Sequence, residues 1–432
     1  MNSLVGWGKT SKNKSQLYSE IKTFGITKLR DGRLGGRNFG LLLFSSIFSS
    51  LSISMYLTVE QWYVVHELGM SQAVGWVLMA TSLPRVLFMM MGGAAADRQS
   101  RTMMILLSLS GRCFVLFTMA GLLAVDQLHL VILCACAALF GISDAFFWPA
   151  RDSLIPQLVN PDRLASANAM MQTSNQISTM LGPLLSAVLL SAFSYITIVL
   201  ILAFMLITAG FCVYRIQDKQ KRPVYTADHP GAGIFRQLQE GFRYVASSSL
   251  LRTIMGTFTV VNLFFVGPLM ISIPLLANAR MGGSAVSLSV MQGAFAMGSL
   301  AGAAVMGLVR LTRRGIWVTG CIALEGVLLI LYSLSDRLPL SAALLALLGS
   351  CVSFINIPVI SLVQESAPAH MLGRIVSLNT MVSMGLIPIS YGLVSFLLTL
   401  KVGIQPMLVT GGVAVIGLAV YLAVKAGALR SI

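Results

Sequence analysis

Charge is the scarcest property of this sequence. Only 10% of the 432 residues are charged, whereas 56% are hydrophobic, and an average soluble domain carries about 25% charged residues. A chain with so few charges cannot cover a water-facing surface with polar side chains. The composition therefore excludes an ordinary soluble enzyme and indicates a protein whose solvent is a lipid bilayer.

Motifs for soluble chemistry are also missing. No G-x-x-x-x-G-K-[ST] loop occurs, so ATP is not expected to be the direct energy source. The six cysteines lie inside apolar runs, and the four histidines form no ligand cluster. No signal peptide is expected, because the first apolar run begins at Phe39 and is too long for one. We expect no enzymatic activity, no metal and no cofactor.

Long apolar segments dominate the rest of the chain. A spanning helix needs roughly 20 mainly apolar residues, and twelve segments qualify: 39–65, 74–96, 103–125, 129–151, 165–191, 194–215, 251–275, 284–309, 315–334, 339–362, 374–399 and 404–424. One long interior link separates the sixth segment from the seventh. We therefore predict an all-α integral membrane protein with twelve transmembrane helices in two six-helix bundles.

The predicted organisation has five parts: a basic cytoplasmic tail, an N-terminal bundle, a cytoplasmic linker, a C-terminal bundle and a second cytoplasmic tail. Their bounds are 1–38, 39–215, 216–250, 251–424 and 425–432. The linker contains GIFRQLQEGFRYV, whose apolar side chains share one helical face, so we predict an amphipathic helix on the inner membrane surface.

The two halves resemble each other. Gly141 and Pro149 have counterparts in Gly349 and Pro358, and an S-x-N-x-M pattern follows in both halves. Both copies run from the fourth helix of a half into the fifth, in the same orientation. Such a parallel repeat predicts bundles related by a pseudo-two-fold axis, as in two-bundle transporters.

Basic residues predict the orientation. With both termini in the cytoplasm, the outer side receives only Arg280, Arg337 and Lys401, while nearly all other Lys and Arg fall inside. The net charge of +15 is then explained by topology and by contacts with anionic lipid, and no nucleic-acid partner is expected. We expect a multi-pass protein of the plasma or inner membrane.

The turn GGAAADRQSR, at residues 92–101, interrupts the apolar sequence between the second and third segments. It resembles the G-x-x-x-D-[RK]-x-G-[RK]-[RK] signature of the major facilitator superfamily. Gly93, Asp97, Arg98 and Arg101 match this signature. Two positions depart from it: Ser100 stands in place of glycine and Thr102 in place of the last basic residue.

The resemblance implies a gating role for this turn. In the family, the aspartate contacts the start of helix 11 and a basic residue at the inner end of helix 4. Arg374 and Arg151 occupy those places here. Asp97 would thus hold the two halves closed on the inner side. The alternative is an ordinary positive-inside loop.

A second resemblance concerns helix 5. Family antiporters carry G(x)8G(x)3GP(x)2GG there, and this chain keeps Gly182 and Pro183 with small residues at the other positions. The resemblance implies an antiporter, and general small-residue packing is the alternative. The stretch FFWPARDSLIPQLVNPDRLASANAM resembles the branch that holds macrolide-efflux-like proteins and enterobactin-type siderophore exporters.

Five charged residues fall within the predicted spans: Glu60, Arg85, Arg112, Asp144 and Glu325. Each costs roughly 2.5–3.5 kcal/mol or more at the bilayer centre. The acids outnumber the bases, so full pairing still leaves one acid over. Burial favours the neutral form of an unpaired acid. The chain would therefore have an acid that can bind a proton, which is the least that a proton-coupled carrier needs.

Family architecture narrows the candidates, because helices 1, 4, 7 and 10 line the central cavity. The resemblance implies that Glu60 and Asp144 face the pathway, with Arg85 within reach of either acid. Arg112 and Glu325 are secondary candidates, and structural pairing or hydrogen bonding is the favoured interpretation for both. Asn262 and Asn356, with Gln292, are expected to add hydrogen bonds from the C-terminal half.

The sequence thus predicts a secondary active transporter that exports a small organic compound, of drug or siderophore type, in exchange for protons. Two bundles would rock around a midplane site, powered by the proton gradient. The expected partners are a small-molecule substrate and membrane lipids, and the expected state is a monomer. A lysophospholipid flippase and a non-transporting sensor with a transporter fold remain as alternatives.

Overall fold

The structure is a computed structural model that describes residues 36–98, 100–216, 243, 246–309, 313–366 and 372–425. Within these ranges every regular secondary-structure element is a helix. The first half contains α2 (Arg37–His66), α3 (Val74–Arg98), α4 (Arg101–Ala124), α5 (Leu130–Ala145), α6 (Phe147–Leu158), α7 (Leu164–Ala192) and α8 (Tyr195–Tyr214), with short 3₁₀ turns η1 (Ser71–Ala73) and η2 (Pro161–Arg163).

The second half contains α10 (Ser249–Val261), the π-helical turn η3 (Asn262–Val266), α11 (Gly267–Arg280), α12 (Ala285–Leu308), α13 (Arg314–Ser333), α14 (Leu338–Ser366), α15 (Leu372–Thr399) and α16 (Ile404–Lys425). Each of the twelve predicted segments coincides with one helix or with consecutive helices. The predicted span 129–151 is divided into α5 and α6 at Phe146, and the seventh span includes the π-helical turn. The predicted all-α membrane fold is confirmed.

Length and composition suit these helices to a bilayer. Ten helical stretches among the described residues are long and apolar enough to cross a membrane. In α15 the apolar stretch Gly385–Thr399 is shorter. The remaining helix, α7, is less apolar because it carries a row of amide side chains. The chain is therefore a multi-pass membrane protein.

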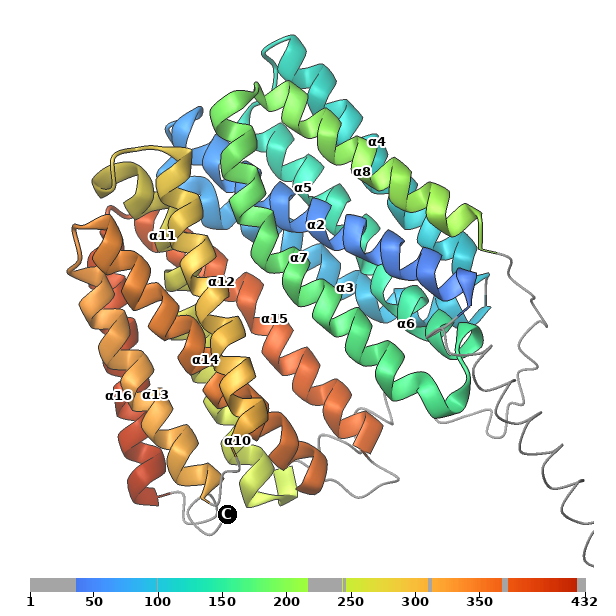
Figure 1. Ribbon diagram of the computed structural model, residues 1–432. Helices are drawn as coiled ribbons and strands as arrows, with labels where there is room; N and C mark the ends of the chain where they lie inside the picture. Colours follow the sequence, from blue (N-terminus) through green and yellow to red (C-terminus); the bar gives the residue numbers. More distant parts are fainter. Residues whose placement is uncertain are drawn as a thin grey trace, which may run out of the picture.

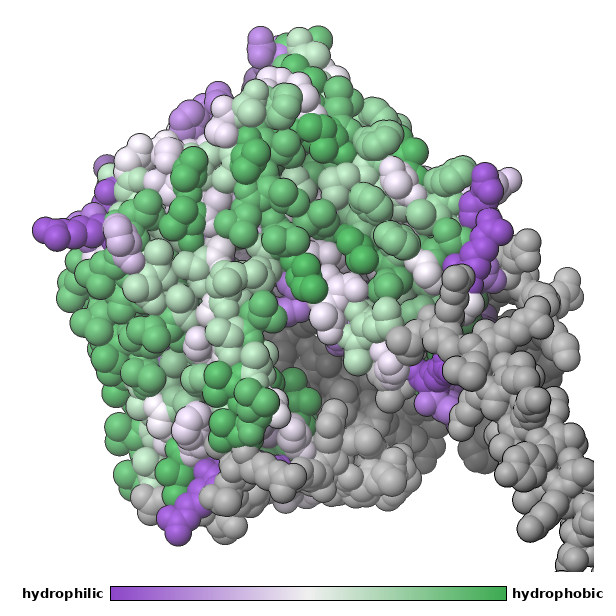
Figure 2. Space-filling view, viewed as in Figure 1, coloured by the Kyte–Doolittle hydropathy of each residue, from purple (hydrophilic) through white to green (hydrophobic). Residues whose placement is uncertain are grey.

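The helices form two bundles, α2–α8 and α10–α16, which meet at one end and diverge toward the other (Figure 1). We call the first the closed end. There α3 packs against α15, and α7 packs against α12. Figure 2 shows hydrophobic residues over most of the visible face, which is hollowed between the bundles beyond the place where they meet.

The two apolar cores interlock at the closed end. Trp62, near the end of α2, is buried within the core of the C-terminal bundle. In the opposite direction, Ile271, Leu275 and Val394 of the second bundle belong to the core of the first. Burial of apolar surface therefore contributes to holding this end closed.

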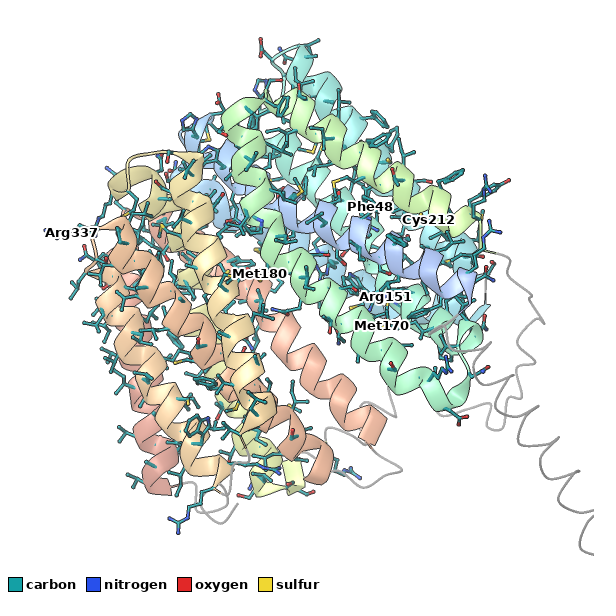
Figure 3. The ribbon with its side chains drawn as sticks, in the orientation of Figure 1. Phe48, Arg151, Met170, Met180, Cys212 and Arg337 are labelled. Atoms are coloured by element: carbon teal, nitrogen blue, oxygen red, sulfur yellow. The ribbon has the colours of Figure 1, made fainter. Side chains whose placement is uncertain are left out.

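The residues predicted to face outward lie at the closed end. Arg280 at the end of α11 binds Asp336, with 3.0 Å between Nη1 and Oδ1, and Gln405, with 2.9 Å between Nη2 and Oε1. Figure 3 shows Arg337 at this end of the second bundle and Arg151 toward the diverging end of the first.

Candidate functional site

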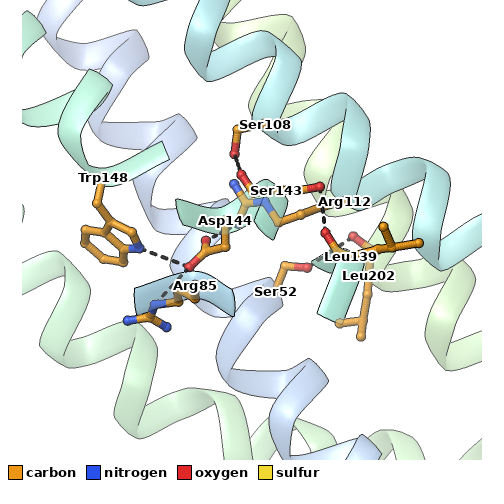
Figure 4. A network of polar contacts seen from close by, with 9 residues as sticks. All are labelled: Ser52, Arg85, Ser108, Arg112, Leu139, Ser143, Asp144, Trp148 and Leu202. Carbon is orange, nitrogen blue, oxygen red and sulfur yellow. Dashed lines mark hydrogen bonds and ion pairs between the residues drawn. The ribbon is translucent and has the colours of Figure 1, made fainter. Parts of the chain in front are cut away.

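An ion-pair cluster lies inside the N-terminal bundle (Figure 4). Arg112 of α4 donates from Nη1 to Oδ1 of Asp144 at 2.9 Å. Arg85 of α3 places Nε 3.6 Å from Oδ2, and Trp148 donates from Nε1 to the same oxygen at 3.3 Å. One carboxylate thus accepts hydrogen bonds from Arg112 and Trp148 and forms an ion pair with Arg85 as well. We call these four residues the charge cluster.

The helix break at Phe146 and the depth of each residue explain how the charge cluster forms. Asp144 occupies the last turn of α5, and Trp148 lies in the first turn of α6. Arg112 lies on the neighbouring α4, about as far from the α4–α5 link as Asp144 is. Phe147 completes the surroundings, with its ring centroid 4.9 Å from Cζ of Arg112.

The charged groups of this cluster are largely removed from solvent. Asp144 is 1% exposed and Arg112 is fully buried, whereas the Arg85 side chain is 29% exposed. Two guanidinium groups face one carboxylate, so the cluster carries a net positive formal charge. Arg85 is its partly exposed cationic member.

Glu60 of α2 has different surroundings. The hydroxyl of Tyr56 donates to Oε1 at 2.8 Å, and that of Thr81 donates to Oε2 at 3.4 Å. Tyr56 is fixed in turn by stacking on Phe140, with ring centroids 4.1 Å apart. Glu60 is 2% exposed, and no cationic side chain pairs with it among the residues that the structure describes.

A polar row runs along α7. Asn168, Gln172, Gln176 and Thr179 are exposed and follow each other at helical spacings of four, four and three residues. The opposite side of the same helix exposes apolar side chains: Ile177, Leu181, Leu185 and Val188. The apolar side suits lipid, so we place the polar row toward the space between the bundles.

Polar contacts also join the bundles at the closed end. Thr58 of α2 donates to Oε1 of Gln292 on α12 at 2.9 Å, and Nε2 of Gln292 lies 3.5 Å from Oε1 of Gln61. Gln292 was expected to supply hydrogen bonds from the second half. Its partners Thr58 and Gln61 lie within one turn of Glu60 on α2, whereas the Glu60 carboxylate itself contacts Tyr56 and Thr81 inside the N-terminal bundle.

Glycines allow the helices of the two bundles to approach closely. A Cβ added to Gly75 on α3 would collide with the carbonyl oxygen of Tyr391 on α15 and lie 2.6 Å from the Ser395 hydroxyl. A Cβ on Gly392 would lie 2.6 Å from the Met79 sulfur. The closed end thus depends on the absence of side chains at the crossing of α3 and α15.

Substitution of Gly75 tests this dependence. In Gly75→Ala the collision with a backbone atom disfavours the closed end by roughly 1–3 kcal/mol. We expect spin labels on Glu67→Cys and Val286→Cys, two exposed positions at this end, to move apart in a background without native cysteines. Gly121→Ala is the control, because nothing lies within 4 Å of the added Cβ. Equal label distances in Gly75→Ala and Gly121→Ala would contradict the conclusion that the close crossing of α3 and α15 holds this end closed.

Comparison with known proteins decides the family. The sequence pattern of the Major Facilitator Superfamily matches residues 42–391, which is most of the chain and includes most of each bundle. The chain belongs to the Major Facilitator Superfamily. Macrolide efflux protein A of Streptococcus pyogenes is 24% identical over 390 residues, covering 88% of this chain and 91% of the relative. Multidrug efflux pump Tap of Mycolicibacterium fortuitum is 24% identical over 351 residues, covering 78% and 83%.

Solved transporters share the fold. A POT family transporter in complex with a thioalcohol-conjugated peptide aligns with a TM-score of 0.71 at 12% identity, covering 91% of this chain and 96% of that chain. A nucleoside transporter aligns with a TM-score of 0.71 at 11% identity, covering 89% and 99%. At such identities the likeness concerns the fold alone.

The superfamily turn lies largely outside the described side chains. α3 ends at Arg98 and α4 begins at Arg101, but the side chains of Gly93, Asp97, Arg98 and Arg374 are outside the described residues. Their gating role stays a prediction. Most of the linker, with its predicted amphipathic helix, and most of both tails lie outside the described residues as well.

The two ends of this turn are described in part. Ser100, which replaces the glycine of the superfamily signature, is the N-cap of α4, and its hydroxyl accepts from Met103 N at 3.4 Å. Arg151 is buried at the diverging end. Its guanidinium contacts Asp152 at 2.6 Å and lies 4.3 Å from the Trp148 ring centroid. Trp148 therefore connects Arg151 to the charge cluster.

The small residues of helix 5 pack α7 against α2. A Cβ on Gly182 would collide with Ser54, which itself donates to the Thr179 carbonyl at 3.1 Å. The Ser178 and Ser186 hydroxyls reach carbonyls of α2, each at 3.4 Å. Gly182 and its neighbour Pro183 thus lie within close packing inside one bundle. An antiporter role for this motif stays a prediction.

The secondary candidates from the sequence lie in two different places. Arg112 belongs to the charge cluster, whereas Glu325, Asn262 and Asn356 line a pocket in the C-terminal bundle. Sequence reasoning missed Tyr56 and Thr81, and it did not predict the hydrogen bond from Trp148 to Asp144. A usable signal exists for Thr81, since it lies about as far from the first helical hairpin's turn as Glu60 does. Adjacent antiparallel helices bring such positions to the same depth.

Proposed function

We propose that this chain exports a small, drug-like organic compound from the cytoplasm in exchange for protons. The names of its efflux relatives support the substrate class and the direction. The hollow between the bundles, with the polar row of α7 beside it, supports a pathway between them. The chain would work as a monomer in the plasma or inner membrane, with the closed end outside and both termini in the cytoplasm.

One observation carries the proton coupling. Among the described residues the side-chain donors to the buried Glu60 are hydroxyl groups, and Glu60 lies within one helical turn of Thr58 and Gln61, which join the bundles at the end that must open to the outside. A carboxyl group in such surroundings favours the neutral form, so it can take up a proton when water reaches it. Opening of the junction would give Glu60 access to external water. After Glu60 binds a proton, the junction on the outer side would close again.

The charge cluster suits a different task. Asp144 was one of the two acids predicted to face the pathway, but its carboxylate already pairs with Arg85 and Arg112. We therefore propose Glu60 as the proton carrier and the charge cluster as a fixed positive centre. Arg85, the partly exposed member, would contact polar groups of the substrate.

Everted membrane vesicles test the proposal. With an acidic lumen, vesicles that contain the protein should accumulate a radiolabelled macrolide, and a protonophore should reduce the accumulation to that of vesicles without the protein. The reason is that an antiporter draws substrate inward as protons leave the lumen. Accumulation driven by ATP in the absence of any ion gradient would contradict antiport. A siderophore gradient formed in place of the macrolide gradient would reassign the substrate.

A further inference from the structure

A separate pocket lies inside the C-terminal bundle, between α10, η3, α13 and α14. Its volume is about 70 Å³, enough for a few water molecules. The wall is mainly apolar, and its polar members are Thr257, Asn262, Glu325 and Asn356. None of these residues belongs to the charge cluster or contacts Glu60.

Two polar groups in this wall lack partners. Glu325 is 1% exposed and Asn262 is 7% exposed. Within the described part of the chain, neither Oε2 of Glu325 nor Nδ2 of Asn262 has a hydrogen-bond partner. A buried donor or acceptor left unsatisfied loses its hydrogen bonds to water without a replacement, which destabilises the folded state. A buried acceptor and a buried donor around one small space therefore indicate that water occupies it.

The local helix geometry places these groups around the pocket. Asn262, Phe265 and Val266 belong to the π-helical turn η3 and all line the pocket. Such turns insert one residue into an α-helix and are frequent at functional sites. The insertion interrupts the regular packing of the seventh span opposite Glu325, so the bundle keeps a space there.

We propose that this pocket is a hydrated proton-binding site whose acid is Glu325. The carboxylate takes a proton from a hydronium ion in the pocket, giving a neutral carboxyl and a water molecule, and the reverse step returns the proton. The site is independent of the antiport proposed above. It lies in the other bundle, and its proton binding is measured without transport.

The charges around Glu325 favour a proton over a metal cation. The titratable groups near it are thiols, Cys321 on its own helix and Cys351 on α14. α16 faces the neighbouring turn of α13 with Gly412 and Ile416, and the pocket face of α10 and η3 carries no titratable side chain. A single carboxylate and two amides supply too few oxygens for a hard cation, which takes six or more ligands.

Infrared difference spectra of the full-length protein in lipid test the site. Between alkaline and acidic buffer, the wild type should gain a protonated-carboxyl carbonyl band that shifts in D₂O and is lost in Glu325→Gln. Asn262→Leu keeps the acid but fills the wet space, so the D₂O shift should appear more slowly. Identical bands in the wild type and Glu325→Gln, or a band that sodium removes at constant pH, would overturn the proposal.

Carbodiimide labelling of the wild type gives a second measurement that does not depend on a folded variant. Carbodiimides attack protonated carboxyl groups in apolar surroundings, and peptide mass spectrometry locates the adduct. Labelling at Glu325 should be strong in acid and lose most of its yield in alkali, while the exposed Asp152 stays unlabelled. Yield at Glu325 that does not change with pH would mean a permanently neutral structural group and would overturn the proposal.

Discussion

Asp144→Asn is expected to lower the apparent Tm of the protein by roughly 10 °C. The substitution keeps the size of the side chain but leaves the fully buried Arg112 without its counter-charge. Breaking a buried ion pair by removing one partner typically costs about 3–5 kcal/mol. Thermal unfolding in detergent, followed by circular dichroism at fixed protein concentration, measures the change.

Two companion variants separate charge from packing. Asp144→Asn combined with Arg112→Gln removes both buried charges and should recover most of the lost stability. Arg85→Gln alone should change the Tm little, because Arg85 is partly exposed and Arg112 still neutralises Asp144. If Asp144→Asn melted like the wild type, the charge cluster would not be an ion-pair centre and Asp144 would return as the proton candidate.

Glu60→Gln should abolish uphill export while leaving exchange of substrate down its own gradient. Glutamine can still accept the hydrogen bond from Tyr56, so the packing around position 60 is kept. It cannot take up or release a proton, so cycles that depend on the proton gradient stop. Uphill accumulation in everted vesicles should fall to the level of vesicles without protein, while counterflow proceeds at the wild-type rate.

The control for Glu60→Gln is Glu67→Gln. Glu67 follows the same helix, is exposed and pairs with His66 at 3.4 Å, so its neutralisation should leave both assays unchanged. Uphill export that survived in Glu60→Gln but failed in Asp144→Asn proteins that fold normally would transfer the coupling role to the charge cluster. Loss of both uphill export and counterflow would mean that Glu60 binds substrate.

The fold was predictable because membrane helices follow from length and hydropathy. Apolar runs fixed twelve spans, and even the divided fourth span and the π-helical seventh span lie where apolar sequence required helices. The breaks at Phe146 and Asn262 do have a signal in the sequence, because Pro149 follows the first and Gly267 and Pro268 follow the π-helical turn. A proline has no backbone N–H to donate to the carbonyl four residues earlier, so regular α-helical hydrogen bonding is interrupted just before it.

The charged residues of the site could be predicted from the sequence, but most of the pairs that they form could not. Hydropathy located every charged residue in the spans, but acid and base counts could not assign partners. The partner of Arg112 follows from its depth, equal to that of Asp144 across the α4–α5 hairpin. Charge counting left one acid over. In the described structure both arginines converge on Asp144, and both Glu60 and Glu325 are left without an ionic partner.

The position of Trp62 gives the resting carrier a preferred direction. Opening the closed end withdraws this indole from the core of the opposite bundle. Exposure of an aromatic side chain of about 150–250 Å² would cost roughly 4–6 kcal/mol, unless cargo or lipid covers it. If the closed end faces outward, as we propose, an empty carrier would wait open toward the cytoplasm, the compartment in which an exporter collects its cargo, and would spend little time exposing a vacant site to the outside.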